Sequence, residues 1–127
     1  MTAFRAVVLE HFRRPQNRGP LAGASVSIEG ANPLCGDRIR IQLRAGDDTI
    51  ADARFTADAC AICIAAASLL TEHIRGMRLR DARSVDIAWL HGSLDGEPPP
   101  GRRRCATLPL ETMHRAIAEL GRGVEQK

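Results

Sequence analysis

Apolar and polar residues alternate along three short segments in the first half of the chain. The first contains Val26 and Ile28 between polar neighbours. Residues 38–44 alternate arginine or glutamine with isoleucine or leucine, and residues 51–57 set alanine and phenylalanine against polar residues. A period of two is typical of strands whose faces differ, and residues 45–48 fit a hairpin turn. The pattern predicts an antiparallel sheet with one apolar face and one face open to water.

Helical periodicity appears on both sides of these strands. Residues 3–13 predict a short amphipathic helix that ends before Pro15, and residues 14–24 carry turn formers that predict a surface loop. Residues 61–75 predict a longer helix, with Gly76 as its C-cap. The apolar stripe expected on this helix consists of Ile62, Ala66, Leu69, Leu70 and Ile74.

The rest of the chain is also predicted to be helical. Residues 79–94 suggest one or two short helices, residues 96–101 an irregular connection, and residues 107–120 a final helix. Strands first and helices second predict an α+β fold, with a three-stranded antiparallel sheet and helices packed on one face. This order does not suit a parallel sheet with crossover helices.

Composition indicates one globular domain spanning residues 1–127. The length is enough for one core but too short for two ordinary domains. Hydrophobic residues make up 44% and charged residues 26% of the chain, as in soluble proteins. Tyrosine is absent, with 3 phenylalanines and 1 tryptophan, which argues against nucleic-acid binding by base stacking.

The charge and hydropathy of the chain limit where the protein can be located in the cell and which classes of molecule it can bind. The net charge is +3, and its positive part is concentrated in Arg102, Arg103 and Arg104, without the broad basic face of a DNA-binding protein. No stretch approaches the roughly 20 apolar residues of a membrane span, and Arg5 and Glu10 interrupt any signal peptide. We expect a cytoplasmic protein, in which cysteines serve metal or thiol chemistry more often than disulfides.

Three cysteines and one aspartate are candidates for a shared metal and sulfur site. Cys35 and Asp37 stand two residues apart at the entrance of a strand, with Gly36 between them. Cys60 opens the alanine-rich helix, and Cys105 precedes the predicted last helix. Helix N-termini favour thiolates, so both cysteines are placed for metal binding and for attack on sulfur.

The three arginines next to Cys105 should lower its pKa and could attract an anionic persulfide; a solvated basic loop is the equal alternative. Three thiolates and a carboxylate suit tetrahedral zinc, or iron with bridging sulfide. A carboxylate is a harder and weaker ligand for cluster iron than a thiolate, so Asp37 could keep a cluster labile. The spacing of the cysteines matches no compact zinc-binding motif. On spacing and chemistry alone, it is equally possible that each cysteine is simply a small, buried apolar residue.

Flanking motifs add a more specific signal. They occupy residues 11–19, 32–37, 52–55, 66–72 and 105–108. Over nearly the whole chain these segments resemble the IscU/SufU/NifU-type iron–sulfur cluster scaffolds, a resemblance that implies a SufE/NifU-like fold. It also implies that Cys35, Cys60 and Cys105 accept persulfide sulfur and, with Asp37, hold iron in a transient [2Fe–2S] cluster, with zinc possible in the same site.

In this family the implied partners are a cysteine desulfurase and apo iron–sulfur or carrier proteins. The leading interpretation is a scaffold rather than an enzyme; the alternative is a SufU-like, zinc-dependent sulfur acceptor, a sulfurtransferase that activates the desulfurase. Arg104 replaces the histidine of the IscU branch and favours the SufU role. The short interval from Cys60 to Cys105 lacks the SufU insertion and favours the scaffold. Residues 98–102 lack the apolar positions of the Hsp70-type chaperone signal, which argues against that chaperone.

Cys63 is additional to the family pattern and creates Cys60-x-x-Cys63 at a helix start. A core-facing role for Cys63 is preferred to ligation. His11 resembles a family position but is expected to pack rather than to bind metal. The remaining histidines belong to no motif and are expected to be surface or core residues: His73, His91 and His114.

Overall fold

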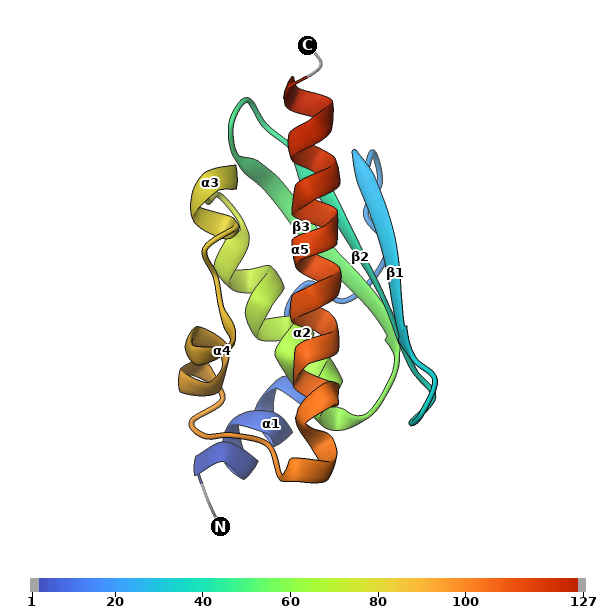
Figure 1. Cartoon of the computed structure of the whole chain (residues 1–127), viewed down its shortest axis with the longest axis vertical. Helices are drawn as coiled ribbons and strands as arrows, with labels where there is room; N and C mark the ends of the chain where they lie inside the picture. Colours follow the sequence, from blue (N-terminus) through green and yellow to red (C-terminus); the bar gives the residue numbers. More distant parts are fainter. Residues whose placement is uncertain (1–2, 126–127) are drawn as a thin grey trace.

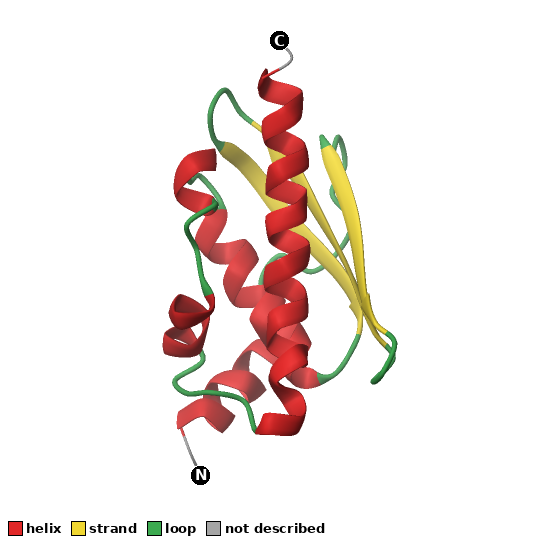
Figure 2. Cartoon of the chain, in the orientation of Figure 1, coloured by secondary structure: helices red, strands yellow, loops and turns green. Residues whose placement is uncertain are grey.

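The computed structural model describes residues 3–125, which form an α+β fold around a three-stranded antiparallel sheet (Figures 1 and 2). Strands β1 (Val26–Asn32), β2 (Asp37–Ala45) and β3 (Ile50–Asp58) lie in the order β1-β2-β3. Each neighbouring pair is antiparallel. The predicted sheet and fold class are confirmed.

The two connections between strands are tight turns. Between β2 and β3, the backbone N–H of Gly46 donates to the carbonyl of Thr49 at 2.9 Å. Between β1 and β2, the N–H of Gly36 donates to the carbonyl of Asn32 at 2.8 Å, and Gly36 has a φ of +78°. Glycine adopts this left-handed backbone conformation at little cost in energy, because it has no Cβ atom. This second turn holds Cys35 directly before the first residue of β2.

One face of the sheet forms the core. Ile41 and Leu43 on β2 and Phe55 on β3 are fully buried there, as the alternation predicted. Helices α2 (Ala61–Ile74) and α5 (Arg103–Glu125) pack on this face, and α5 runs along the length of the molecule (Figure 1). The other face carries the charged side chains, and Leu21, a buried residue outside the core cluster, donates its N–H to Gln42 Oε1 of β2 at 2.9 Å.

Helix α2 differs from the amphipathic helix that its sequence predicts. It is buried on nearly all sides, because the sheet, α5, α4 (Ile87–Ser93) and α1 (Ala3–Arg13) all contact it. Its buried polar residues have partners within the described chain. The Ser68 hydroxyl lies 2.8 Å from His11 Nδ1, and the Thr71 hydroxyl donates to the carbonyl of Ala67 at 2.7 Å. The single apolar stripe was therefore the wrong description of this helix.

The C-terminal half contains α3 (Leu79–Ala82), α4 and a 3₁₀ turn, η1 (Pro100–Arg102), before α5. One or two short helices were predicted in the 79–94 region, and the structure has two. Residues 96–101 were expected to be irregular, but residues 100 and 101 belong to the 3₁₀ turn. Gly76 is not the C-cap of α2: the C-cap is Arg75, and Gly76 follows it with a φ of +80°.

The last helix begins earlier than predicted. It starts at Arg103 rather than at residue 107, so Cys105 lies inside its first turn and does not precede it. The first turn exposes its arginines to solvent and gives no apolar periodicity, which is why the pattern missed it. Within residues 3–125, no helix is both long enough and apolar enough to cross a membrane.

Candidate metal and sulfur site

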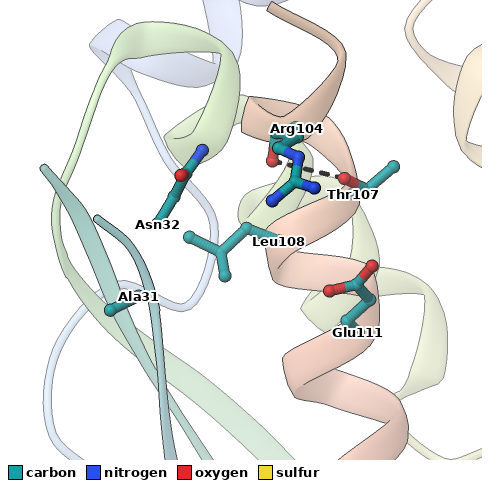
Figure 3. Close-up of a pocket in the computed structure, with 6 residues that line it drawn as sticks. All are labelled: Ala31, Asn32, Arg104, Thr107, Leu108 and Glu111. Carbon is teal, nitrogen blue, oxygen red and sulfur yellow. Dashed lines mark hydrogen bonds between the residues drawn. The ribbon is translucent and has the colours of Figure 1, made fainter. Parts of the chain in front are cut away.

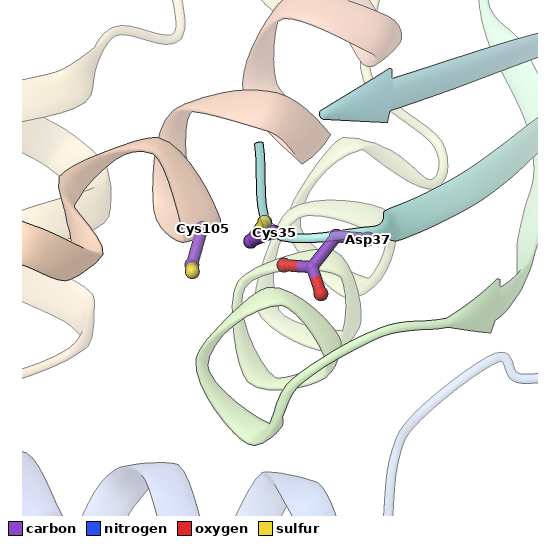
Figure 4. A group of neighbouring side chains, drawn as sticks. All are labelled: Cys35, Asp37 and Cys105. Carbon is purple, nitrogen blue, oxygen red and sulfur yellow. The ribbon is translucent and has the colours of Figure 1, made fainter. Parts of the chain in front are cut away.

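Three of the four predicted site residues come together where β2 and α5 begin. The Sγ atoms of Cys35 and Cys105 and a carboxylate oxygen of Asp37 all lie within 4.8 Å of one another. Figure 4 shows the three side chains, contributed by the turn before β2, by β2 and by the first turn of α5. Cys35 is exposed, whereas Asp37 and Cys105 are only 5% and 3% exposed. The cluster thus has one open side.

The Asp37 carboxylate ties the start of β2 to the start of α2. Its Oδ1 accepts the backbone N–H of Cys60 at 3.0 Å. Its Oδ2 is buried and has no hydrogen-bond partner among residues 3–125. A buried carboxylate oxygen without a partner is costly, and a cation bound beside it would compensate it. The side chains present therefore fit a metal ion or an iron-containing cargo.

Cys60 lies next to this cluster but outside it. It is the N-cap residue of α2, with φ −70° and ψ 167°, and it is half-buried. Its thiol interacts with that of Cys105, but its Sγ is not among the three ligand atoms that lie within 4.8 Å of one another. The structure therefore gathers Cys35, Asp37 and Cys105, with Cys60 adjacent to them.

The pKa of the Cys105 thiol is not lowered, contrary to the prediction from its helix and its arginines. Burial, followed by the hydrogen bond and charge of Cys60 and by the charge of Asp37, raises the Cys105 pKa to about 12. The contact with Arg102 acts in the opposite direction but is outweighed. Without a bound cation the thiol is therefore protonated at neutral pH, and binding of a metal there would release its proton.

The three arginines before Cys105 have different surroundings. The exposed guanidinium of Arg102 contacts Cys105, and its pKa is raised by this hydrogen bond and by the charge of that thiolate. Arg103 lies 3.9 Å from Glu97 in an exposed ion pair. Arg104 is exposed and lines both the cavity beside Cys35 and Cys105 and a second cavity. Arg102 is thus the arginine placed to act on sulfur chemistry, and the other two fit a solvated basic surface.

A cavity of about 550 Å³ opens the site to solvent. It is lined by Cys35 and Cys105, by Leu34, which is 85% exposed, and by the segment 100–104. The second cavity, of about 250 Å³, lies between the end of β1 and α5 (Figure 3). Its lining comprises Ala31, Asn32, Arg104, Thr107, Leu108 and Glu111, and it contains none of the site cysteines. Access to the thiols is therefore through the first cavity.

The sequence prediction gave no role to Asn32, which shapes the turn carrying Cys35. Asn32 is 7% exposed, and its Oδ1 accepts the N–H of Leu34 at 3.1 Å. Its carbonyl accepts the N–H of Cys35 at 3.3 Å and that of Gly36 at 2.8 Å. An asparagine before a proline is a turn signal that could have identified it.

The other cysteine and the histidines lie outside the cluster. Cys63 is 0% exposed and belongs to the hydrophobic core, so its predicted core-facing position is confirmed. The ring of His73 stacks on Trp89 with 3.9 Å between centroids, and His114 Nε2 lies 2.7 Å from the carbonyl of Val85. His91 lies 3.9 Å from Glu97. With the bond to Ser68 described above, His11 also has a packing role, as predicted.

The known proteins to which this chain is similar belong to one family. The family described as "NifU-like N terminal domain" matches residues 3–126. The bifunctional protein NifU/MnmA of Rubrobacter xylanophilus is 38% identical over 88% of this chain, but this chain spans only 23% of that protein. The zinc-dependent sulfurtransferase SufU of Bacillus subtilis is 29% identical over 93% of this chain and 91% of its own length. The iron–sulfur cluster assembly scaffold protein IscU of Rickettsia prowazekii is 32% identical, over 98% and 97%.

A solved structure agrees with this match. The crystal structure of a putative iron–sulfur cluster assembly scaffold protein for the SUF system from Fervidobacterium islandicum AW-1 has a TM-score of 0.76. It covers 87% of this chain and 93% of its own chain, at 23% sequence identity, so the likeness concerns the fold. Because the family match extends over residues 3–126 and the IscU relative aligns over nearly its full length, this chain belongs to the NifU-like N-terminal domain family, with IscU- and SufU-type proteins among its relatives.

Proposed function

We propose that this chain is a scaffold for the assembly and transfer of iron–sulfur clusters. In this proposal Cys35, Asp37, Cys60 and Cys105 hold iron and sulfide as cargo. The observation that carries it is the meeting of two thiols with a carboxylate oxygen of Asp37, a residue whose Oδ2 is buried without a partner in the described chain, with the Cys60 thiol beside them. Thiolates are the ligands of iron in clusters, and a buried carboxylate oxygen without a partner fits a cation.

The relatives support the scaffold role. The Rickettsia protein aligned over almost its whole length is an iron–sulfur cluster assembly scaffold by name. The residues that align with such a protein include the whole candidate site, because 98% of this chain is covered. The chain would act as one scaffold domain, and the continuous hydrophobic core shared by the sheet, α2 and α5 supports this.

The finer features of the proposal follow from the chemistry of the site. Four ligand side chains suit a small cluster such as [2Fe–2S], held transiently because one ligand is a carboxylate. The sulfur would come from a cysteine desulfurase as persulfide, and the cluster would pass to apo iron–sulfur or carrier proteins. The solvent-open cavity beside Cys35 and Cys105 offers a path for both transfers. A cytoplasmic location is part of the proposal and is supported by four free thiols.

A SufU-like sulfur acceptor is the second candidate. The Bacillus subtilis relative, a zinc-dependent sulfurtransferase by name, aligns over 93% of this chain. Arg104 directly before Cys105 also follows the SufU pattern. In this role zinc would hold the thiolates until contact with a desulfurase freed one of them to accept sulfur.

Anaerobic reconstitution with iron, cysteine and a cysteine desulfurase distinguishes the two candidates. The scaffold proposal predicts a visible chromophore that is lost when the cluster is transferred to an apo-ferredoxin. Substitution of Cys35 by serine should abolish the chromophore, whereas substitution of the core residue Ile74 by valine should leave it intact. If zinc stays tightly bound, no chromophore forms and desulfurase turnover rises, the scaffold proposal is wrong and the SufU-like role replaces it.

A further inference from the structure

Two cysteines lie in the first turn of α2. Cys60 is the N-cap residue, its carbonyl accepting the N–H of Ile64 at 3.1 Å, and Cys63 is the third residue of the helix. Residues three apart at a helix start are neighbours within the roughly 4.4–6.8 Å Cα separation that a disulfide requires. The first turn of α2 thus places the two cysteines at a backbone separation that allows a disulfide.

The two thiols differ in access. Cys60 is half-buried at the edge of the candidate site, whereas Cys63 is 0% exposed beneath it. Of these two thiols, a sulfur donor from solvent therefore meets Cys60 first. Cys63 is enclosed in the hydrophobic core, so it meets donated sulfur only through Cys60.

We propose that Cys63 resolves a persulfide on Cys60 and so releases sulfide inside the site. This inference rests on the proposed function, because it presupposes that Cys60 accepts sulfur. It assigns an activity to a cysteine that the ligand set does not use. It also supplies what assembly needs, since a persulfide carries sulfur at the oxidation level of the element, whereas a cluster contains sulfide.

The step balances within the protein. The Sγ of Cys63 attacks the Sγ of Cys60, the sulfur–sulfur bond of the persulfide breaks, and a Cys60–Cys63 disulfide forms. The outer sulfur leaves with the electron pair of the broken bond and takes the proton of the Cys63 thiol, so it departs as hydrogen sulfide. The two cysteine sulfurs provide the two electrons. Hydrosulfide is a better leaving group than an alkyl thiolate, because its pKa is lower. A dithiol reductant must then reduce the disulfide before the next turnover.

The arrangement of the other ligands suits this step. Cys35, Asp37 and Cys105 gather within 4.8 Å without Cys60. A disulfide on Cys60 therefore leaves these three groups in place, next to the point at which sulfide is released. Reduction would return Cys60 to the ligand set.

The test uses the full, reduced, metal-free chain and inorganic polysulfide as the sulfur donor, under anaerobic conditions without added reductant. Intact mass and a peptide map of disulfides and persulfides are measured, because loading from polysulfide itself leaves sulfide behind. The wild-type chain should form a Cys60–Cys63 disulfide, with a mass lower by two hydrogen atoms. Cys63→Ala should form no such disulfide and instead keep a persulfide on Cys60, with a mass higher by one sulfur atom.

Two further variants guard against effects of folding. Cys63→Ser removes the thiol with little change in volume, and Ile74→Val trims another fully buried side chain of α2 while leaving both cysteines. The serine variant should behave as the alanine variant, and Ile74→Val as wild type. A wild-type chain that keeps its persulfide on Cys60, or that forms its disulfide between Cys60 and Cys105 instead, overturns this inference alone. Failure of every variant to acquire sulfur overturns the proposed function as well.

Discussion

The two carboxylate oxygens of Asp37 lie in different surroundings. Oδ1 accepts the N–H of Cys60 at 3.0 Å, whereas Oδ2 is buried without a hydrogen-bond partner in the described part of the chain. An oxygen ligand is a harder and weaker partner for cluster iron than a thiolate. In the proposed scaffold, Asp37 would therefore combine a structural bond to α2 with a weak ligand position, which suits a site that releases its cargo.

Asp37→Ala should lengthen the lifetime of a reconstituted cluster, because the readily exchanged oxygen ligand is removed. We expect an increase of roughly threefold to tenfold, which corresponds to about 0.7–1.4 kcal/mol. Decay of the visible absorbance in the presence of an iron chelator measures it. Asp58→Ala, which removes an exposed carboxylate at the end of β3, is the matched control and should leave the lifetime unchanged. Faster decay in Asp37→Ala would contradict the role given to this carboxylate.

Arg102 is distinguished from Arg103 by its contact with Cys105. Arg102→Ala should slow sulfur transfer from a desulfurase by about twofold to fivefold, the range expected of an exposed charge. Arg103→Ala removes the same charge from a side chain paired with Glu97 and should have a smaller effect. Transfer rates measured at low and high ionic strength provide the check, because salt screens exposed charges. Equal effects of the two substitutions would mean that only the net charge of the loop matters.

The turn at residues 33–36 is the element that positions Cys35. Its last residue, Gly36, has a φ of +78°, and no atom lies within 4 Å of a Cβ added there in the described structure. Gly36→Ala therefore introduces backbone strain without a steric clash. We expect a loss of about 1–2 kcal/mol in the free energy of unfolding, together with weaker zinc binding. Urea denaturation and a zinc competition assay measure the two effects.

Gly92→Ala is the control for this substitution. Gly92 lies in α4, also has no described atom within 4 Å of an added Cβ, and does not have a positive φ. Because alanine favours a helix over glycine, this variant should be about 0.5–1 kcal/mol more stable than wild type and should bind zinc normally. A Gly36→Ala chain that matches Gly92→Ala in both assays would show that the left-handed turn does not govern the position of Cys35.

The same elements show what could be predicted from the sequence. Strands β2 and β3 were predictable because one face is apolar and the other solvated, so burial appears directly as alternation. Helix α2 was harder, because a helix enclosed on nearly all sides has no polar face to define a stripe. The start of α5 was missed because its exposed first turn carries arginines. The raised pKa of Cys105 depends on burial, which local sequence does not reveal.

At the scale of the whole molecule, the site joins the starts of β2, α2 and α5, which are far apart in sequence. Asp37 begins β2 and bonds to the N-cap of α2, and Cys105 lies in the first turn of α5. The spacing of the cysteines could not reveal this meeting, because it depends on the hairpins and on the packing of both helices against one face of the sheet. The family motifs predicted the site residues, and the fold explains how residues so far apart in sequence can lie next to one another.

A ligand held between these elements should stabilise the folded chain. Zinc at 100 times its dissociation constant should add about 2.7 kcal/mol to the free energy of unfolding, because unfolded chains lack the assembled site. Thermal unfolding with zinc and with a chelator measures the difference.

Cys35→Ser should unfold like wild type without metal, since Cys35 is exposed, but should lose most of the zinc-dependent shift. Cys63→Ala should be less stable without metal, because it leaves a cavity in the core, yet should retain the shift. The reverse pattern would place the metal at the Cys60-x-x-Cys63 pair and not at the junction of β2, α2 and α5.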